Sequence, residues 1–267
     1  MKKVLSKDGT EIAYETKGSG PGLIFVDGAL GYRGLKFNEQ LEDLLAPNFT
    51  VYRYDRRGRG ESTNSKPFAV QREVEDIDAL IQAAGGSAYV YGISSGACLA
   101  VEAAAQLGGK IKKLALYEAP YNSDPTSRQA WWDYRGHLKE LILSNKPGEA
   151  VILFMQFVGT PEEMIKGMQQ SPVWPLLVSV APTLEYDAAA IGDDRTVPTD
   201  RAAKVQAATL VMDGGANLVI MPFMHASAVT LAQSISHSEH RTLEGQTHAV
   251  EAGALAPILV DFFSKQE

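Results

Sequence analysis

The chain has 267 residues, of which 45% are hydrophobic and 21% are charged. This length and composition suit one large core with an inserted subdomain, and they exclude a chain that is disordered over most of its length. The 32 acidic residues outnumber the 25 basic residues, for a formal charge of −7. No basic surface for nucleic acid or an anionic membrane is therefore expected, and we predict neither as a partner.

The single cysteine, Cys98, has no second cysteine with which to form a disulfide bond. The first eight residues end in charged residues, whereas a signal peptide would continue into an apolar segment. No apolar run approaches the roughly 20 residues that are needed to span a bilayer. These features predict a soluble, cytoplasmic protein, and they do not indicate its oligomeric state.

Short β-rich runs alternate with helical patterns from residue 22 to about residue 118, which is the spacing of βαβ units in a mostly parallel sheet. The runs near residues 22, 88 and 114 are almost entirely apolar, as in strands that helices cover on both faces. Apolar residues at helical spacing predict helices over 70–84 and 249–265. The predicted strands are 11–17, 22–27, 50–54, 88–92, 112–118, 208–213 and 239–244.

The pattern changes between residues 121 and 204, where strand signals disappear. This segment holds seven of the 13 prolines and all three tryptophans. An uninterrupted loop of this length is implausible in a compact domain, so short helices separated by proline turns are the better interpretation. We therefore predict a helical cap at 121–204, inserted into a core domain formed by 1–120 and 205–267.

The sharpest local motif is Gly92-Ile93-Ser94-Ser95-Gly96, which follows a buried strand and precedes a helix-favouring run. A serine on such a tight strand-to-helix turn needs glycines two positions away on either side, because the reversing chain leaves almost no room for side chains. Ser94 is therefore the candidate nucleophile. A plain glycine turn is the competing interpretation of this motif.

A serine hydroxyl becomes a good nucleophile only when a base takes its proton, and that base is usually a histidine oriented by a carboxylate. His248 directly follows the last predicted strand, where a loop reaches the carboxyl edge of the sheet. The other histidines, His137, His225, His237 and His240, have no comparable position. His248 is therefore the candidate base.

These motifs resemble those of the α/β-hydrolase superfamily over residues 8–265, with the cap as the variable part. A third motif, Asp55-Arg56-Arg57-Gly58-Arg59-Gly60-Glu61-Ser62, looks like the superfamily's turn after its fourth strand. The resemblance implies an α/β fold with a mostly parallel eight-stranded sheet and helices on both faces. A serine at position 94 argues against the dehalogenase and epoxide-hydrolase branches, which have aspartate there. We interpret the arginine-rich motif as a structural turn.

The acid that would orient His248 departs from the common pattern of the superfamily. Most relatives have an aspartate after the seventh strand, where this chain has Asn217, and an amide cannot stabilise an imidazolium as a carboxylate does. Glu118 ends the predicted strand 112–118, which is the sixth in the superfamily's count, on the same edge as Ser94. It is the predicted acid, and Asp213 is the alternative. Ser94 and a glutamate 24 residues later, together with Val26-Asp27-Gly28, are similar to the pattern of zearalenone lactone hydrolases.

Acyl transfer also needs N–H donors for the oxyanion that develops on the substrate. The backbone N–H of Ser95 is the first predicted donor, and that of Gly28 or Ala29, in the loop after the 22–27 strand, is the second. Asp27 stands where many relatives have histidine. Its carboxylate is predicted either to tune substrate choice or to hold this loop.

The cap supplies bulky apolar residues that suit a hydrophobic substrate. The predicted substrate-binding residues are Trp131, Trp132, Phe154, Met155 and Trp174. The sequence has no Cys/His pairs at zinc spacing and no phosphate-binding loop, so we predict neither a metal nor a cofactor.

The sequence thus predicts a serine hydrolase that cleaves a small hydrophobic ester or lactone through an acyl-enzyme. A ligand receptor with little turnover stays an alternative because of Asn217. So do an acyltransferase, a carbon–carbon bond hydrolase and a cyclase, which could use the same residues.

Overall fold

A computed structural model describes residues 1–36 and 38–265 of the chain. Its centre is one eight-stranded sheet with the strand order β1-β2-β4-β3-β5-β6-β7-β8. Pairs β1–β2 and β2–β4 are antiparallel, and the remaining neighbours are parallel. The strands are β1 (Lys2–Leu5), β2 (Glu11–Lys17), β3 (Gly22–Val26), β4 (Thr50–Tyr54), β5 (Ala88–Ile93), β6 (Ile111–Tyr117), β7 (Ala208–Gly214) and β8 (Ser238–Leu243).

Helices cover both faces of the sheet, as the apolar strands predicted. The core helices are α1 (Glu39–Leu45), α2 (Val70–Ala83), α3 (Ser95–Leu107), α9 (Thr199–Ala202), α10 (Asn217–Ile220), α11 (Pro222–Ser234) and α12 (Ala252–Ser264). Short 3-10 turns are η1 (Arg33–Leu35) and η2 (Gly108–Lys110). Alternate residues of one strand face opposite layers: Leu23 of β3 packs with α1 and α12, and Ile24 packs with α2 and α3.

The predicted strands and the α/β fold class are confirmed. The chain adds β1 (Lys2–Leu5), which the strand predictions did not include. This edge strand is short, and two of its four residues are lysines, so it shows no alternating apolar pattern. Its pairing with β2 determines its conformation.

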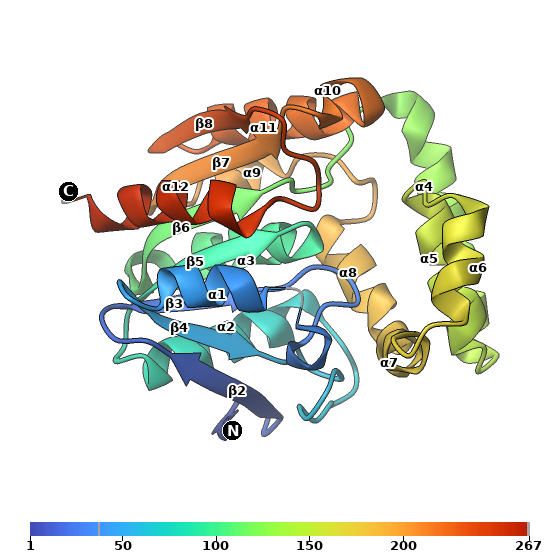
Figure 1. Cartoon of the computed structure of the whole chain (residues 1–267), viewed down its shortest axis with the longest axis horizontal. Helices are drawn as coiled ribbons and strands as arrows, with labels where there is room; N and C mark the ends of the chain where they lie inside the picture. The colour runs from blue at the N-terminus through green and yellow to red at the C-terminus, as the bar shows by residue number, and fades with distance from the viewer. Residues whose placement is uncertain (37, 266–267) are drawn as a thin grey trace.

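Residues 121–204 form helices without strands. They are α4 (Pro125–Leu143), α5 (Pro147–Phe157), α6 (Glu162–Gln169), α7 (Trp174–Val180), η3 (Ala181–Thr183) and α8 (Leu184–Ile191), followed by α9. Helices α4 to α7 lie beyond one edge of the layered core, and α8 leads back toward it (Figure 1). Helix α8 packs on α3, and α9 packs on α3 and α11. No helix of the described residues is long and apolar enough to cross a membrane.

Cys98 lies on α3 in the middle of the core and has no solvent-exposed surface. Burial raises the pKa of its thiol to about 12, and only the thiolate reacts quickly with disulfide reagents. We expect Cys98 to react with Ellman's reagent at about pH 8 only after denaturant unfolds the chain. Rapid release of the thionitrobenzoate chromophore by the folded protein would contradict the buried position of α3.

Candidate active site

The Ser94 turn joins β5 to α3 and has a strained backbone. Ser94 has φ +58° and ψ −132°, and its N–H donates to the Tyr117 carbonyl at 2.9 Å. A Cβ at Gly92 would lie 2.7 Å from the Gly96 carbonyl oxygen, and a Cβ at Gly96 would collide with the carbonyls that end β3. The two glycines are therefore required by close backbone contacts, and the turn places Ser94 at the carboxyl edge of the sheet.

His248 and Glu118 form a hydrogen-bonded pair at the same edge. The distance from His248 Nδ1 to Glu118 Oε2 is 2.7 Å, and the carboxylate is buried. Because an ionised carboxylate only accepts, Nδ1 carries the proton and Nε2 is left as a proton acceptor. The Tyr117 hydroxyl donates to the Thr247 carbonyl at 2.6 Å, which fixes the loop that presents His248.

Asn217, which the resemblance places at the usual position of the acid, donates to Glu118 in this structure. Its Nδ2 lies 2.7 Å and 2.9 Å from the two carboxylate oxygens of Glu118. The Gly214 N–H also donates to Glu118 Oε1, at 2.9 Å. Both oxygens of the buried carboxylate therefore have hydrogen-bond partners, and the amide at 217 holds the predicted acid in place.

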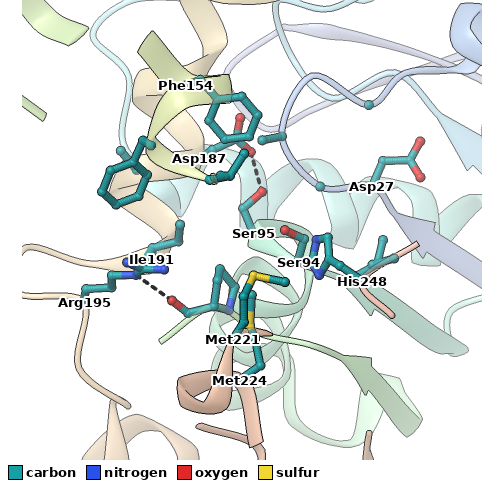
Figure 2. A pocket seen from close by; sticks show the side chains of 18 of the residues that line it. Asp27, Ser94, Ser95, Phe154, Asp187, Ile191, Arg195, Met221, Met224 and His248 are labelled. Atoms are coloured by element: carbon teal, nitrogen blue, oxygen red, sulfur yellow. Dashed lines mark hydrogen bonds between the residues drawn. The ribbon is translucent and has the colours of Figure 1, made fainter. Parts of the chain in front are cut away.

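Ser94 and His248 line the same pocket. Figure 2 shows the hydroxyl of Ser94 next to the imidazole of His248. The described residues show no direct hydrogen bond between the two side chains. Such bonds are often long in an unliganded site and tighten when substrate arrives. The arrangement brings the candidate nucleophile, the candidate base and the candidate acid to one edge of the sheet.

Asp213, the alternative acid, contacts other histidines. Its carboxylate lies 3.0 Å from His225 Nδ1 and 2.6 Å from His240 Nε2, and the Thr242 hydroxyl donates to it at 3.1 Å. The ligand atoms of Asp213, His225 and His240 lie within 4.8 Å of one another, which makes them the one group of the described residues that could hold a metal ion. This group is separate from the residues that line the Ser94 pocket.

The predicted oxyanion donors lie beside Ser94. A Cβ at Gly28 would lie 2.9 Å from the Ser94 Cβ, and Gly28, Ala29 and Ser95 all line the pocket. Ser95 is the first residue of α3, so its N–H is one of the helix-terminal donors that have no partner within the helix. Its hydroxyl donates to Asp187 of α8 at 2.8 Å.

Residues 27–31, which carry the predicted donors Gly28 and Ala29, are called the oxyanion loop below. Two buried arginines of the 55–62 turn hold this loop. Arg59 donates to the carbonyls of Gly28 at 2.7 Å and Gly31 at 2.9 Å, and Arg56 donates to the Asp27 carbonyl at 3.2 Å. With its carbonyls fixed on the arginine side, the loop turns toward Ser94. The turn is structural, as predicted, but it also supports the site, which the sequence interpretation did not include.

Asp187 joins these arginines to the cap. Its carboxylate lies 2.6 Å from Arg56 and 2.7 Å from Arg59. Burial raises the pKa of Asp187, but the two guanidiniums outweigh this effect and hold the pKa below its usual value. The ionised carboxylate of α8 is therefore held by the same two arginines that hold the loop of the predicted oxyanion donors.

Asp27 lines the pocket wall but has its own partner. Asn38 Nδ2 donates to its carboxylate at 2.5 Å, and Figure 2 shows the carboxylate pointing away from Ser94. Burial raises the pKa of Asp27, although Arg53 and the hydrogen bond from Asn38 oppose the shift. These contacts agree with the interpretation in which Asp27 holds the loop.

The pocket is a cavity of about 630 Å³ with mostly apolar walls. Of the predicted substrate-binding residues, Trp131 and Phe154 line it. The sequence interpretation missed other wall residues because they come from segments that only the fold brings together. They include Tyr32, Arg53, Ile93, Tyr134, Ile191, Arg195, Met221, Phe223 and Met224.

Three predicted substrate-binding residues lie outside the described lining, and their prediction is corrected. Trp132 follows Trp131 on α4 and points to a different side, where it is 49% exposed and donates to the Asp193 carbonyl. Met155 is turned into the cap core next to Phe154 in the same way. Trp174 packs on α5, where a Cβ at Gly148 would lie 3.7 Å from Trp174 Cζ2. Consecutive residues of a helix point about 100° apart, and here this difference turns Trp132 and Met155 away from the wall that Trp131 and Phe154 line.

The mostly parallel sheet, the strained serine turn after β5 and the late histidine define the α/β-hydrolase class of proteins. The family model described as the alpha/beta hydrolase family matches residues 21–252, and the chain belongs to that family.

Comparison with solved structures supports the same assignment. An alpha/beta hydrolase from Sphaerobacter thermophilus is 46% identical, with a TM-score of 0.88 over 98% of this chain and 100% of the other. The enol-lactonase of Burkholderia xenovorans shares the fold at 21% identity, with a TM-score of 0.73 over 99% of this chain and 100% of that one.

A provisionally named non-heme bromoperoxidase of Mycobacterium tuberculosis, BpoC, is 33% identical over 92 residues. This match covers 34% of the chain and only 35% of the curated relative.

Proposed function

We propose that this protein is a serine hydrolase that cleaves a carboxylic ester or lactone of a small hydrophobic substrate. The observation that carries the proposal is the position of the Ser94 turn beside the paired His248 and Glu118, at the wall of an apolar pocket. The enol-lactonase that shares the fold acts on a lactone by its name, which is consistent with this class of substrate.

In the proposed reaction, Ser94 Oγ attacks the substrate carbonyl while His248 Nε2 takes the hydroxyl proton. The Ser95 N–H and that of Gly28 or Ala29 donate to the oxyanion, and His248 then gives the proton to the leaving oxygen. Water then attacks the acyl-enzyme while His248 Nε2 takes its proton. The bond between the acyl group and Ser94 Oγ breaks, His248 returns the proton to Ser94 Oγ, and the acid product leaves. Glu118 stays ionised and stabilises the imidazolium formed in each half of the reaction.

The test is intact-mass measurement after treatment with a fluorophosphonate probe, which labels only activated serines. We expect one adduct per chain on wild type, located on Ser94 by peptide mapping, and none on Ser94→Ala. Ester and lactone substrates should then give products that contain one solvent oxygen. An unlabelled wild-type protein that still binds ligands would overturn the proposal in favour of a receptor on this fold.

A further inference from the structure

Arg195 is a charged residue in the wall of a mostly apolar cavity, whose other charged lining residues are Asp27, Arg53 and Asp187. It lies between α8 and α9 and has a left-handed backbone with φ +61°. Its Nε donates to the Pro120 carbonyl at 2.8 Å, and its own carbonyl accepts from the Asn122 N–H at 2.7 Å. These contacts fix Arg195 to the loop after β6, and its side chain lies on the pocket wall across from Ser94 (Figure 2).

Arg195 has no acidic partner among residues 1–36 and 38–265. The buried arginines Arg56, Arg57 and Arg59 each have a carboxylate oxygen within 2.6 to 2.7 Å. No carboxylate lies within 4.0 Å of Arg195 in the described part of the chain. Its only side-chain hydrogen bond there is the one from Nε, so the N–H groups of both Nη atoms are free to bind a ligand.

Aromatic rings surround the guanidinium where a counter-ion would otherwise be expected. The guanidinium carbon lies 4.8 Å from the Phe223 ring centre, 5.2 Å from that of Phe157 and 5.6 Å from that of Trp131. Ring faces stabilise a cation but compensate only part of its lost hydration. Burial lowers the pKa of Arg195 to about 10, so the group keeps its positive charge at neutral pH.

A planar guanidinium with free Nη donors matches a carboxylate, which accepts two parallel hydrogen bonds. We propose that Arg195 binds the free carboxylate of the substrate while Ser94 faces its ester or lactone carbonyl. The inference rests on the proposed function and narrows its substrate class to apolar esters or lactones that carry an acidic group.

The other charges of the pocket favour this orientation. Asp187 is paired with Arg56 and Arg59, Arg53 has Glu42 at 3.4 Å, and Asp27 accepts from Asn38. Arg195 is therefore the lining arginine without an acidic partner among the described residues, and a substrate carboxylate would balance its charge there. The neutral carbonyl therefore belongs at Ser94 and the anion at Arg195.

The first experiment compares two 4-nitrophenyl esters of equal length, one ending in a carboxylate and the other in a primary carboxamide. The mono-4-nitrophenyl ester of pimelic acid and its terminal amide form such a pair. We expect kcat/KM of wild type to favour the carboxylate by about 10- to 100-fold, as for a charge-assisted hydrogen bond.

Three variants assign this preference to the guanidinium. Arg195→Met should bring the ratio of the two kcat/KM values close to one, and Arg195→Lys should keep part of it. Arg135→Met removes a cap arginine that pairs with exposed Asp193, and it should leave the ratio at the wild-type value. A wild-type ratio near one, or a ratio that Arg195→Met does not change, would overturn the proposal.

A binding measurement separates this inference from the proposed hydrolysis. In Ser94→Ala, octanoate should change tryptophan fluorescence at lower concentration than octanamide, because Trp131 lies beside the guanidinium. This difference should disappear when Arg195→Met is added. Arg195-dependent octanoate binding without turnover by wild type would retain the anion site and reject the hydrolase. Turnover of both esters without a carboxylate preference would retain the hydrolase and reject the anion site.

Discussion

Replacing Glu118 by Gln is expected to lower kcat by about 10⁴-fold, the size of the loss when the triad acid of a serine protease becomes an amide. Glu118 accepts from His248 Nδ1 at 2.7 Å, which fixes the tautomer and balances the imidazolium. A glutamine can present its NH₂ to Nδ1, which would move the imidazole proton to Nε2, where it blocks proton transfer from Ser94. Steady-state turnover of an ester that wild type cleaves measures this loss.

Asn217 supplies the matched comparison. Asn217→Ala removes two donors from Glu118 but leaves the carboxylate and its contacts with His248 and Gly214. We expect about a tenfold loss of kcat, consistent with the loss of orienting hydrogen bonds to a charged group. Equal losses at positions 118 and 217 would contradict the assignment of Glu118 as the acid. Thermal unfolding of both variants checks that the fold is retained.

The elements that follow from local chemistry could be predicted from the sequence. Buried parallel strands such as β3 are continuous apolar runs, and the glycines around Ser94 are required by contacts within a few residues of the turn. The position of Glu118 beside His248 could be predicted because the ends of neighbouring parallel strands share one edge of the sheet. Strand β1 could not, because its four residues take their conformation from pairing with β2.

Contacts that depend on the return of the cap could not be predicted. Asp187 meets Arg59 across 128 sequence positions, and nothing near either residue indicates the partner. The aromatic rings around Arg195 come from α4, α5 and α11. Helical periodicity identifies such residues as apolar or charged, but the packing of the cap decides which of them face the pocket. The same reason explains why Trp131 lines the pocket and Trp132 does not.

Asp187→Asn is expected to lower the free energy of unfolding by about 3 to 5 kcal/mol, because it leaves buried guanidinium charge without its carboxylate. Arg59 loses the only carboxylate it contacts among the described residues, while Arg56 keeps Glu73. Urea unfolding followed by tryptophan fluorescence measures the change. Asp193→Asn is the control, since Asp193 is 94% exposed and its pair with Arg135 is a surface contact. It should not move the unfolding midpoint measurably.

The pH dependence of this difference tests whether charge is its cause. Arg59 and Arg56 outweigh the effect of burial and hold the pKa of Asp187 below its usual 3.8, so folding favours the ionised carboxylate. Its stabilising contribution is therefore complete well above pH 3.8 and is lost as pH falls through the lower folded-state pKa. The gap between wild type and Asp187→Asn should narrow over that acidic range. A gap independent of pH would assign the loss to packing and would leave Asp187 without an electrostatic role in joining α8 to the oxyanion loop.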